Sequence, residues 1–402
     1  MNKHLGELMA EDGINRSIQK WLYKVRKANY IESEQRGNGG AGDFTHVTYC
    51  AAVNAGDTVL SQCVRKTVAR EMKIAHWNIL SAAAPVTEDT LHRINESMGL
   101  WIGGGGYFLP DTNENAISGW QWAIPSEMLA RIQVPVYVFS VGYNYFPGQE
   151  PNQLFRDSLN ALAEKSSFFG LRNMGSVKAV RNMLDSDALR NKVQYQPCTT
   201  TLIRKLYEHL PEKRDHQSVA VNMAFDRENL RFGEHEERIL KEVAKAVAGI
   251  EKKGYDIHYV CHCWNDDKFL PYLKDAKVKY KLVDLSRQYP DAVIRFYQDM
   301  DVVIGMRGHA QMIPFGLNCE MISLGTHDKV KWFLEDIGAE DWYVDIAKDC
   351  HSIESRILEV FERMHEKERD ETRIRLKDAQ EHLWNVTLEN LKSIHSSLGG
   401  SL

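Results

Sequence analysis

The sequence predicts an α/β protein built from two doubly wound parallel sheets that face a common cleft. Short apolar runs typical of buried strands alternate with amphipathic segments of about 10–15 residues, which is the pattern of β-α-β units. Two such alternations follow one another and meet near residues 196–201. The chain has 402 residues, enough for about two or three domains.

The first alternation begins after a glycine-rich stretch at residues 35–42. Gly99 follows a helical segment and is typical of the residue at which a helix ends. The strands expected here are 47–53, 74–78, 100–102, 134–141 and 168–172. The helices expected here run through 64–68, 87–98, 154–162 and 176–184, with a further helix capped by Ser126.

The second alternation is more regular. Its expected strands are 219–223, 257–261, 280–283, 302–304 and 321–324. Its expected helices are 234–252, 267–273, 290–297, 309–315, 329–337 and 352–364. A last helix, 374–394, carries an apolar stripe that must pack on another part of the chain, and we expect it to cross back to the first domain.

These elements give four expected parts. Residues 1–42 form a helical extension and a flexible stretch, 43–198 an N-terminal α/β domain for the acceptor, 199–370 a C-terminal α/β domain for the donor, and 371–402 the C-terminal helix. Residues 1–30 are charged throughout, so we expect neither a signal peptide nor a membrane anchor. Any membrane contact would then be made from the side, at the inner membrane surface.

Composition excludes several classes of protein. The chain is 43% hydrophobic and 26% charged, with a net charge of −5 and no basic run, so nucleic-acid binding is not expected. Seven scattered cysteines fit a reducing cytoplasm better than a disulfide framework. The triplet Cys261-His262-Cys263 has the wrong spacing for zinc, and we expect no metal site.

The strongest candidate site is the segment 301–310. An apolar strand ends at Gly305, and Arg307, Gly308 and His309 follow at the start of a helix. Free amides at a helix start and an arginine fork both suit phosphate or carboxylate, and a histidine can titrate near neutral pH. The alternative is an ordinary helix start with a surface arginine.

Two further cations follow predicted strands. Lys329 falls at a helix start, where the helix dipole opposes a positive charge and a bound anion would relieve the repulsion. Arg172 ends a strand of the first half, just before a helix capped in the Asn173–Ser176 segment, and could reach across the cleft to the same anion. Solvated side chains are the alternative for both.

Polar and glycine-rich loops of the first half are candidates for the other substrate. The run Gly103–Gly106 would allow a ligand to approach the backbone closely, and it lacks the spacing of a dinucleotide site. Asn54 and Asp57 offer an amide and a carboxylate that suit sugar hydroxyls. A packing turn and a helix cap are equal alternatives.

Taken together, these motifs resemble the polysaccharide pyruvyl transferase family from about residue 47 to residue 338. The resemblance rests on Asn54-x-Gly56-Asp57, the Gly103–Gly106 run, Arg172 before Ser176, Arg307-x-His309-Ala310 and Lys329. Gly308 stands where the family usually has leucine, and Asn173 stands where aspartate is common.

The resemblance implies a fold like that of the two-domain, B-type glycosyltransferases, with Rossmann-like halves. It implies phosphoenolpyruvate as co-substrate, no cofactor, and a hexose diol of a free or lipid-linked polysaccharide as acceptor, giving a cyclic pyruvate ketal and phosphate. The residues it assigns to catalysis are Arg172, Arg307 and His309, and those it assigns to the donor also include Gly308 and Lys329. The candidates for the acceptor are Asn54, Asp57, Gly104, Gly105 and Asp111.

Ketal formation needs an acid that protonates the methylene carbon of the donor. His309 is the candidate, although it could instead hold the phosphate; Asp57 and, more weakly, Asp111 are candidates for the acceptor base. Two other functions fit the same residues. One is a nucleotide-sugar glycosyltransferase, in which the cations hold a diphosphate, and the other is a non-catalytic saccharide-binding relative.

Overall fold

The fold contains two six-stranded sheets in which every neighbouring pair of strands is parallel, and this confirms the predicted fold class. The computed structural model describes residues 44–49, 54–72, 76–110, 116–348 and 351–398. The predicted N-terminal extension lies outside the described residues. The limits proposed for the separate domains stay a proposal; the change of sheet falls between β6 and β7.

The first sheet has the order β2-β1-β3-β4-β5-β6 and the second the order β12-β11-β10-β7-β8-β9. The strands of the first sheet are β1 (Phe44–Thr48), β2 (Trp77–Ser81), β3 (Leu100–Phe108), β4 (Val136–Tyr143), β5 (Ser166–Leu171) and β6 (Val193–Tyr195). Those of the second are β7 (Ser218–Asn222), β8 (Asp256–Cys261), β9 (Tyr280–Asp284), β10 (Val302–Gly305), β11 (Glu320–Gly325) and β12 (Tyr343–Asp345).

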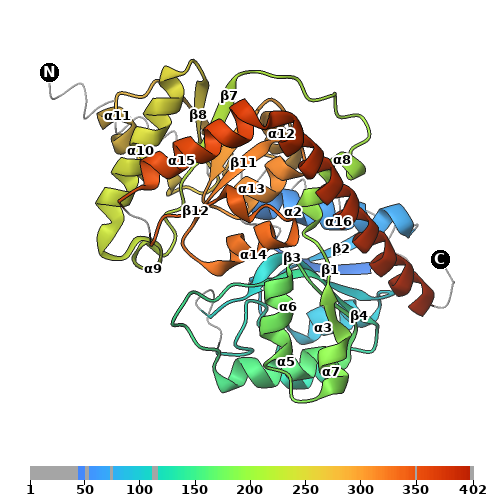
Figure 1. Ribbon diagram of the computed structural model, residues 1–402. Coiled ribbons are helices and arrows are strands. Elements are labelled where there is room, and N and C mark those ends of the chain that lie inside the picture. Colours follow the sequence, from blue (N-terminus) through green and yellow to red (C-terminus); the bar gives the residue numbers. More distant parts are fainter. Residues whose placement is uncertain (1–43, 50–53, 73–75, 111–115, 349–350, 399–402) are drawn as a thin grey trace, which may run out of the picture.

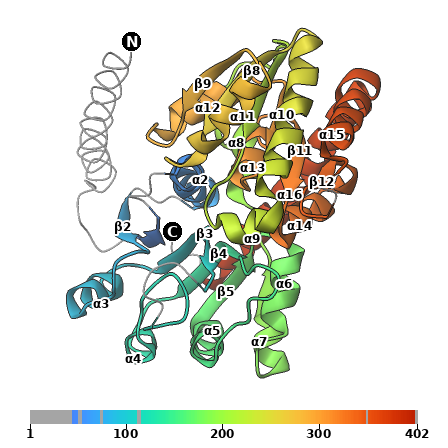
Figure 2. The same ribbon diagram turned by 90° about the vertical axis from the view of Figure 1, so that its left-hand side faces the viewer.

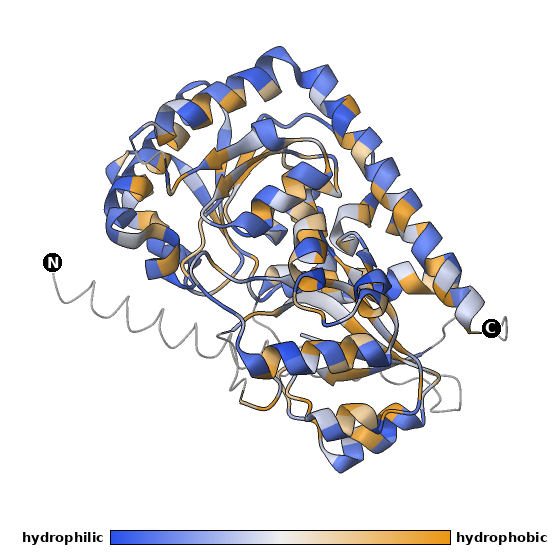
Figure 3. Ribbon diagram, turned by 60° about the horizontal axis from the view of Figure 1, so that its bottom comes forward, coloured by the Kyte–Doolittle hydropathy of each residue, from blue (hydrophilic) through white to orange (hydrophobic). Residues whose placement is uncertain are grey.

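Helices cover the sheets and carry their apolar residues toward them (Figure 3). Those around the first sheet are α2 (Ala55–Glu71), α3 (Glu88–Asn95), α4 (Ser126–Ala130), α5 (Gln153–Lys165), α6 (Met174–Arg181) and α7 (Asp187–Lys192). The others are α8 (Ile203–Leu206), α9 (Glu228–Phe232), α10 (Glu236–Lys252), α11 (Leu270–Asp275), α12 (Pro290–Gln298), α13 (His309–Phe315), α14 (Asp328–Asp336), α15 (Ile353–Phe361) and α16 (Arg369–Ser397).

Central strands are buried along their whole length because helices cover both faces of a parallel sheet. All four residues of β10 and all five of β7 are buried. A helix at the surface buries one side: α10 buries positions such as Ile239, Val243 and Val247 and exposes Lys241 and Lys245. This difference in periodicity is why the sequence predicted the long elements well.

The predicted glycine run belongs to a strand. β3 was expected to end at Ile102, but it continues through Gly103–Gly106 to Phe108. A Cβ at Gly103 would lie 1.9 Å from the carbonyl oxygen of Phe139 on β4, so glycine is required by the neighbouring backbone. Gly104 has φ +72° and faces Val64 of α2. The glycines therefore serve packing between strands and against a helix.

Both sheets reverse their order at one point, between β1 and β3 in the first and between β7 and β10 in the second. In doubly wound sheets, ligands bind beyond the carboxyl ends of the strands at such a point. The loops that leave β1, β7 and β10 are therefore the expected places for a site.

Helix α2 lies between the two sheets (Figures 1 and 2). It contacts β3 of its own sheet and also α12 and α13 of the second one. The amide of Ala55, its first residue, donates to the carbonyl oxygen of His262 at 3.1 Å. The amide of Met174 on α6 likewise donates to the Asp336 carboxylate of α14. The two halves thus meet through helix ends on both sides of the cleft.

The last helix returns to the first sheet, as predicted. α16 runs along the side of both lobes (Figure 1). Asn390 donates to the backbone of Tyr195 at 2.8 Å and to the side chain of Gln196 at 2.9 Å, and Gln196 donates to Thr387 at 3.2 Å. These buried polar contacts fix the position of the helix against the segment that links the two sheets.

Candidate functional site

A cavity of about 290 Å³ lies between the two halves, where the loops after β1, β3, β7 and β10 meet. The structure brings most of the predicted site residues to it. Those that line the cavity are Asn54, Asp57, Arg172, Arg307, Gly308, His309 and Lys329. Gly104 and Gly105 do not line it, and Gly106 does. Asp111 lies outside the described residues.

Arg172 enters the cavity from the end of β5, and its guanidinium lies beside the glycines Gly106 and Gly142. A Cβ at Gly142 of β4 would lie 2.2 Å from its Nε, so only glycine leaves room for the guanidinium. One terminal nitrogen donates to Oδ1 of Asn144 at 2.8 Å, while the buried Nε has no hydrogen-bond partner. The side chain is only 3% exposed. A buried, partly unsatisfied arginine at a cavity wall is suited to bind an anion.

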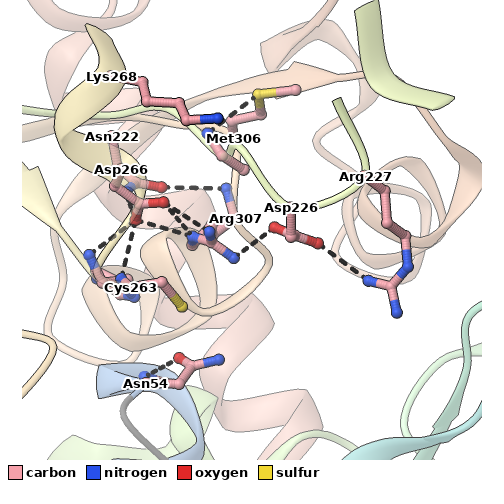
Figure 4. A network of polar contacts seen from close by, with 12 residues as sticks. Asn54, Asn222, Asp226, Arg227, Cys263, Asp266, Lys268, Met306 and Arg307 are labelled. Carbon is pink, nitrogen blue, oxygen red and sulfur yellow. Dashed lines mark hydrogen bonds and ion pairs between the residues drawn. The ribbon is translucent and has the colours of Figure 1, made fainter. Parts of the chain in front are cut away.

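Arg307 is held differently from the prediction. Its guanidinium was expected to face the donor, but two carboxylates occupy it (Figure 4). Nε and one terminal nitrogen donate to the fully buried Asp266 at 2.9 and 2.6 Å. The other terminal nitrogen donates to Asp226 at 2.7 Å. Asp266 and Asp226 make Arg307 a rigid part of the cavity wall whose charge is already compensated.

Asp226, in the loop after β7, binds three arginines. Besides Arg307, it accepts from Arg231 at 2.9 Å and from Arg227 at 3.0 Å. Burial opposes ionisation of this carboxyl, but the three cations lower its pKa well below its usual range. Arg227 reaches it from a left-handed backbone conformation, with φ 58° and ψ 46°, which is unusual for a residue other than glycine.

Lys329 lies on the first turn of α14 and faces the cavity from the second sheet. Among the described residues, no carboxylate lies within ion-pair distance of its ammonium. Burial, together with the charges of Arg172 and Arg231, lowers its pKa well below 10.5. A Cβ at Gly308 would lie 3.3 Å from Cε of Lys329, so a side chain at position 308 would crowd the lysine.

His309 begins α13 and lies against the start of α2. A Cβ at Gly56 would lie 2.5 Å from both Cβ and Nδ1 of His309, which explains why glycine occupies the first turn of α2. Nε2 lies 3.8 Å from Sγ of Cys198, in the segment that links the sheets. Burial and then the charge of Arg172 lower the pKa of His309 well below 6.5, so the imidazole is neutral while the cavity holds no anion.

Two further residues line the cavity but were not singled out from the sequence. The ring of Phe146, in the loop after β4, is stacked on the imidazole of His327 with centroids 4.6 Å apart and planes 26° apart. The guanidinium carbon of Arg231 lies 5.4 Å from the centroid of the same phenyl ring. Phe146 lies in a loop of the first half, whereas His327 and Arg231 lie in the second half. The phenyl ring therefore bridges the two walls of the cavity.

The residues missed by sequence analysis share a recognisable position. Asn144, Asp226, Asp266 and His327 each follow the end of a strand, as the predicted residues do. The same criterion could therefore have found them. What it could not show is which of them face the cavity and which face an arginine.

The electrostatics of the cavity favour an anion. Among the described residues, Arg172 and Lys329 have no carboxylate within ion-pair distance, whereas Arg307 and Arg231 do. After burial, the charge of Arg172 lowers the pKa of both Lys329 and His309, and the charge of Lys329 lowers that of His309 further. A bound anion would relieve this repulsion and replace the missing counter-charge.

Comparison with solved structures shows which known folds this fold is similar to. A putative UDP-N-acetylglucosamine 2-epimerase from Listeria monocytogenes is similar with a TM-score of 0.52 at 12% identity, covering 89% of this chain and 98% of that one. A UDP-glucosyltransferase from Polygonum tinctorium is similar with a TM-score of 0.48 at 10% identity, covering 90% and 100%. The chain thus has an α/β fold with two six-stranded parallel sheets, similar to the fold of the Listeria protein.

Comparison of the sequence with protein families identifies the family of the chain. The profile of the family described as polysaccharide pyruvyl transferase matches residues 54–328, more than half of the chain. The protein therefore belongs to the polysaccharide pyruvyl transferase family, as the motifs predicted, and is a transferase for which the family implies a polysaccharide acceptor. No curated protein sequence matches the chain. Among the described residues, no helix is long and apolar enough to span a membrane.

The two departures from the family pattern have structural explanations. Asn173 caps α6 by accepting from the amide of Ser176 at 2.7 Å, a bond that an aspartate could accept equally well. A Cβ at Gly308 would lie 3.3 Å from Cε of Lys329, so the residue at position 308 affects the place of this lysine in the cavity.

Proposed function

We propose that the protein transfers the three-carbon unit of phosphoenolpyruvate to two hydroxyls of a saccharide, forming a cyclic pyruvate ketal and releasing phosphate. The observation that carries the proposal is the convergence of Arg172, Lys329 and His309 from three separate loops on one cavity. Family membership supports the same reaction class.

The donor carries a phosphate and a carboxylate, and the two cations without carboxylate partners suit these groups. Arg172 offers a planar fork with an unsatisfied Nε, and Lys329 offers an ammonium. The compensated Arg307 supports the loop that carries His309 and adds little net charge. Arg307 thus changes from a donor ligand in the sequence-based prediction to a positioning residue in this proposal.

His309 is the proposed acid. Burial and neighbouring cations disfavour its imidazolium form and lower its pKa well below 6.5. A donor anion beside it raises its pKa and so supplies the proton-bearing form when the donor is bound. Transfer of that proton to the methylene carbon makes C2 electrophilic, and such acids contribute about 10²–10⁴-fold to a rate.

The test is incubation of the protein with phosphoenolpyruvate and a panel of methyl hexosides and polysaccharide fragments. We expect phosphate release that depends on the acceptor and a product whose mass exceeds that of the acceptor by pyruvate less water. His309→Ala should bind the donor and lose about 10²-fold or more of the rate. Release of nucleoside diphosphate from sugar nucleotides, with no reaction of phosphoenolpyruvate, would refute the proposal in favour of a glycosyltransferase.

A further inference from the structure

Besides His309, two histidines line the cavity: His262, whose Nε2 lies 2.5 Å from the hydroxyl of Tyr297, and His327, to which no role has yet been given. His327 is only 5% exposed. Its ring is fixed face to face with Phe146, and its Nδ1 lies 3.5 Å from Oγ1 of Thr326. One face and the Nδ1 side of the ring are therefore occupied, which fixes the orientation of the imidazole in the cavity wall.

We infer that His327 is the base that accepts the proton of the acceptor hydroxyl in the proposed reaction. The inference rests on the proposed function and assigns to His327 the role that sequence analysis gave to Asp57. The charge of Asp57 instead interacts with Arg172, on the donor side of the cavity. The ring of Phe146 covers one face of the His327 imidazole, and among the described residues no carboxylate lies within ion-pair distance of it.

The charges around His327 suit a base. Burial and then the cations Lys329 and Arg231 lower its pKa well below 6.5, Asp226 opposes them, and Arg172 adds to the lowering. These groups come from the segments after β5, β7 and β11, and together with burial they lower the affinity of the imidazole for a proton. A bound donor brings negative charge, which raises the pKa toward the working pH, where a general base is most effective. The base is thus activated only after the donor is in place.

The proton balance of the reaction requires two such groups. In the first step His309 gives its proton to the methylene carbon, the acceptor oxygen bonds to C2, and the hydroxyl proton passes to His327. In the second step the other hydroxyl oxygen bonds to C2 while the bond from C2 to the phosphate oxygen breaks. The second hydroxyl proton returns to His309, and His327 gives its proton to the departing phosphate. Both imidazoles end as they began.

The inference is tested with the methyl hexoside or fragment that the parent protein converts. We expect His327→Ala to bind phosphoenolpyruvate as the parent does, measured by calorimetry, while kcat falls about 10²–10⁴-fold. The acidic limb of the kcat–pH profile should disappear, and added imidazole should restore part of the rate. His92→Ala, at an exposed site on α3, is the matched control.

Two further variants separate the alternatives. Phe146→Leu keeps the imidazole but removes its stacking partner, so we expect a smaller loss of rate with the acidic limb retained. If His327→Ala keeps the rate and the pH limb, or if Asp57→Asn rather than His327→Ala removes the limb, His327 is not the base. A parent protein that transfers no pyruvyl unit to any acceptor would instead refute the proposed function, which is a separate observation.

Discussion

Asp266 should be among the most sensitive positions of the protein, although it is not expected to touch a substrate. Its fully buried carboxylate accepts from Arg307 at 2.6 and 2.9 Å, from the amides of His262 and Cys263 at 2.9 and 3.1 Å, and from Asn222 at 3.2 Å. Asp266→Asn keeps the shape but replaces one acceptor oxygen with an amide donor. Arg307 then loses most of its counter-charge inside the protein.

Breaking a buried ion pair by removing one partner costs about 3–5 kcal/mol. At an unfolding entropy of about 2.1 cal/mol/K per residue, each kcal/mol shifts the melting midpoint of a 402-residue chain by roughly 1 °C, so the midpoint should fall by about 4–6 °C. Circular dichroism at 222 nm is the assay. Asp256→Asn, which breaks the exposed pair with Lys281, is the control, and such a surface pair is worth about 0.2–1 kcal/mol. An Asp266→Asn protein that melts as the control does would refute the view that Arg307 is held by carboxylates.

Three other changes have defined outcomes. Lys329→Met removes a buried cation whose pKa in the folded protein is well below its value in the unfolded chain. The unfolded lysine therefore binds its proton more tightly, so the loss of stability caused by burying Lys329 is greatest at low pH and fades as pH rises toward 10.5. Calorimetry should show that the variant is more stable than the parent at pH 7 but binds phosphoenolpyruvate about 10–100-fold more weakly. Gly308→Leu should displace Lys329 and weaken donor binding to a similar extent, with little change in melting temperature. Burial raises the pKa of Asp336 to about 7, so this carboxyl holds its proton more tightly in the folded protein than in the unfolded chain. As pH rises from 4 to 7, Asp336→Asn should therefore gain stability relative to the parent, by at most about 4 kcal/mol in denaturant titrations. A difference in unfolding free energy between the two proteins that is the same at pH 4 and pH 7 would contradict this.

The fold was predictable because periodicity reports which faces of an element are buried. Fully buried strands such as β10 and one-sided helices such as α10 differ in their sequence patterns, and the expected bounds of α13 agree with the structure. The short strands β6 and β12, with three residues each, were not predicted, because so few residues carry no period. Glycines misled the prediction at β3, where the need for space between strands resembles the need for space around a ligand.

The site was predictable in part for a topological reason. Parallel sheets bring the loops at the carboxyl ends of their strands to one edge, so polar residues that follow strands, such as Arg172 and His309, are expected to meet. The geometry gives Gly56, Gly142 and Gly308 a role that the sequence did not reveal: each lacks a side chain where a cavity residue needs the space. Their partners lie far away in the chain, so no local pattern identifies them.

By itself, the sequence determined the α/β class, the family and the set of polar residues at the strand ends, since these depend on local patterns and on short motifs. Only the tertiary structure decided which charges are compensated. Arg307 and Arg172 look alike in sequence, yet Arg307 is paired with Asp226 and Asp266 and Arg172 has no carboxylate beside it among the described residues. The physical reason is that the strength of a charge depends on partners within a few ångströms, and the fold alone sets those distances.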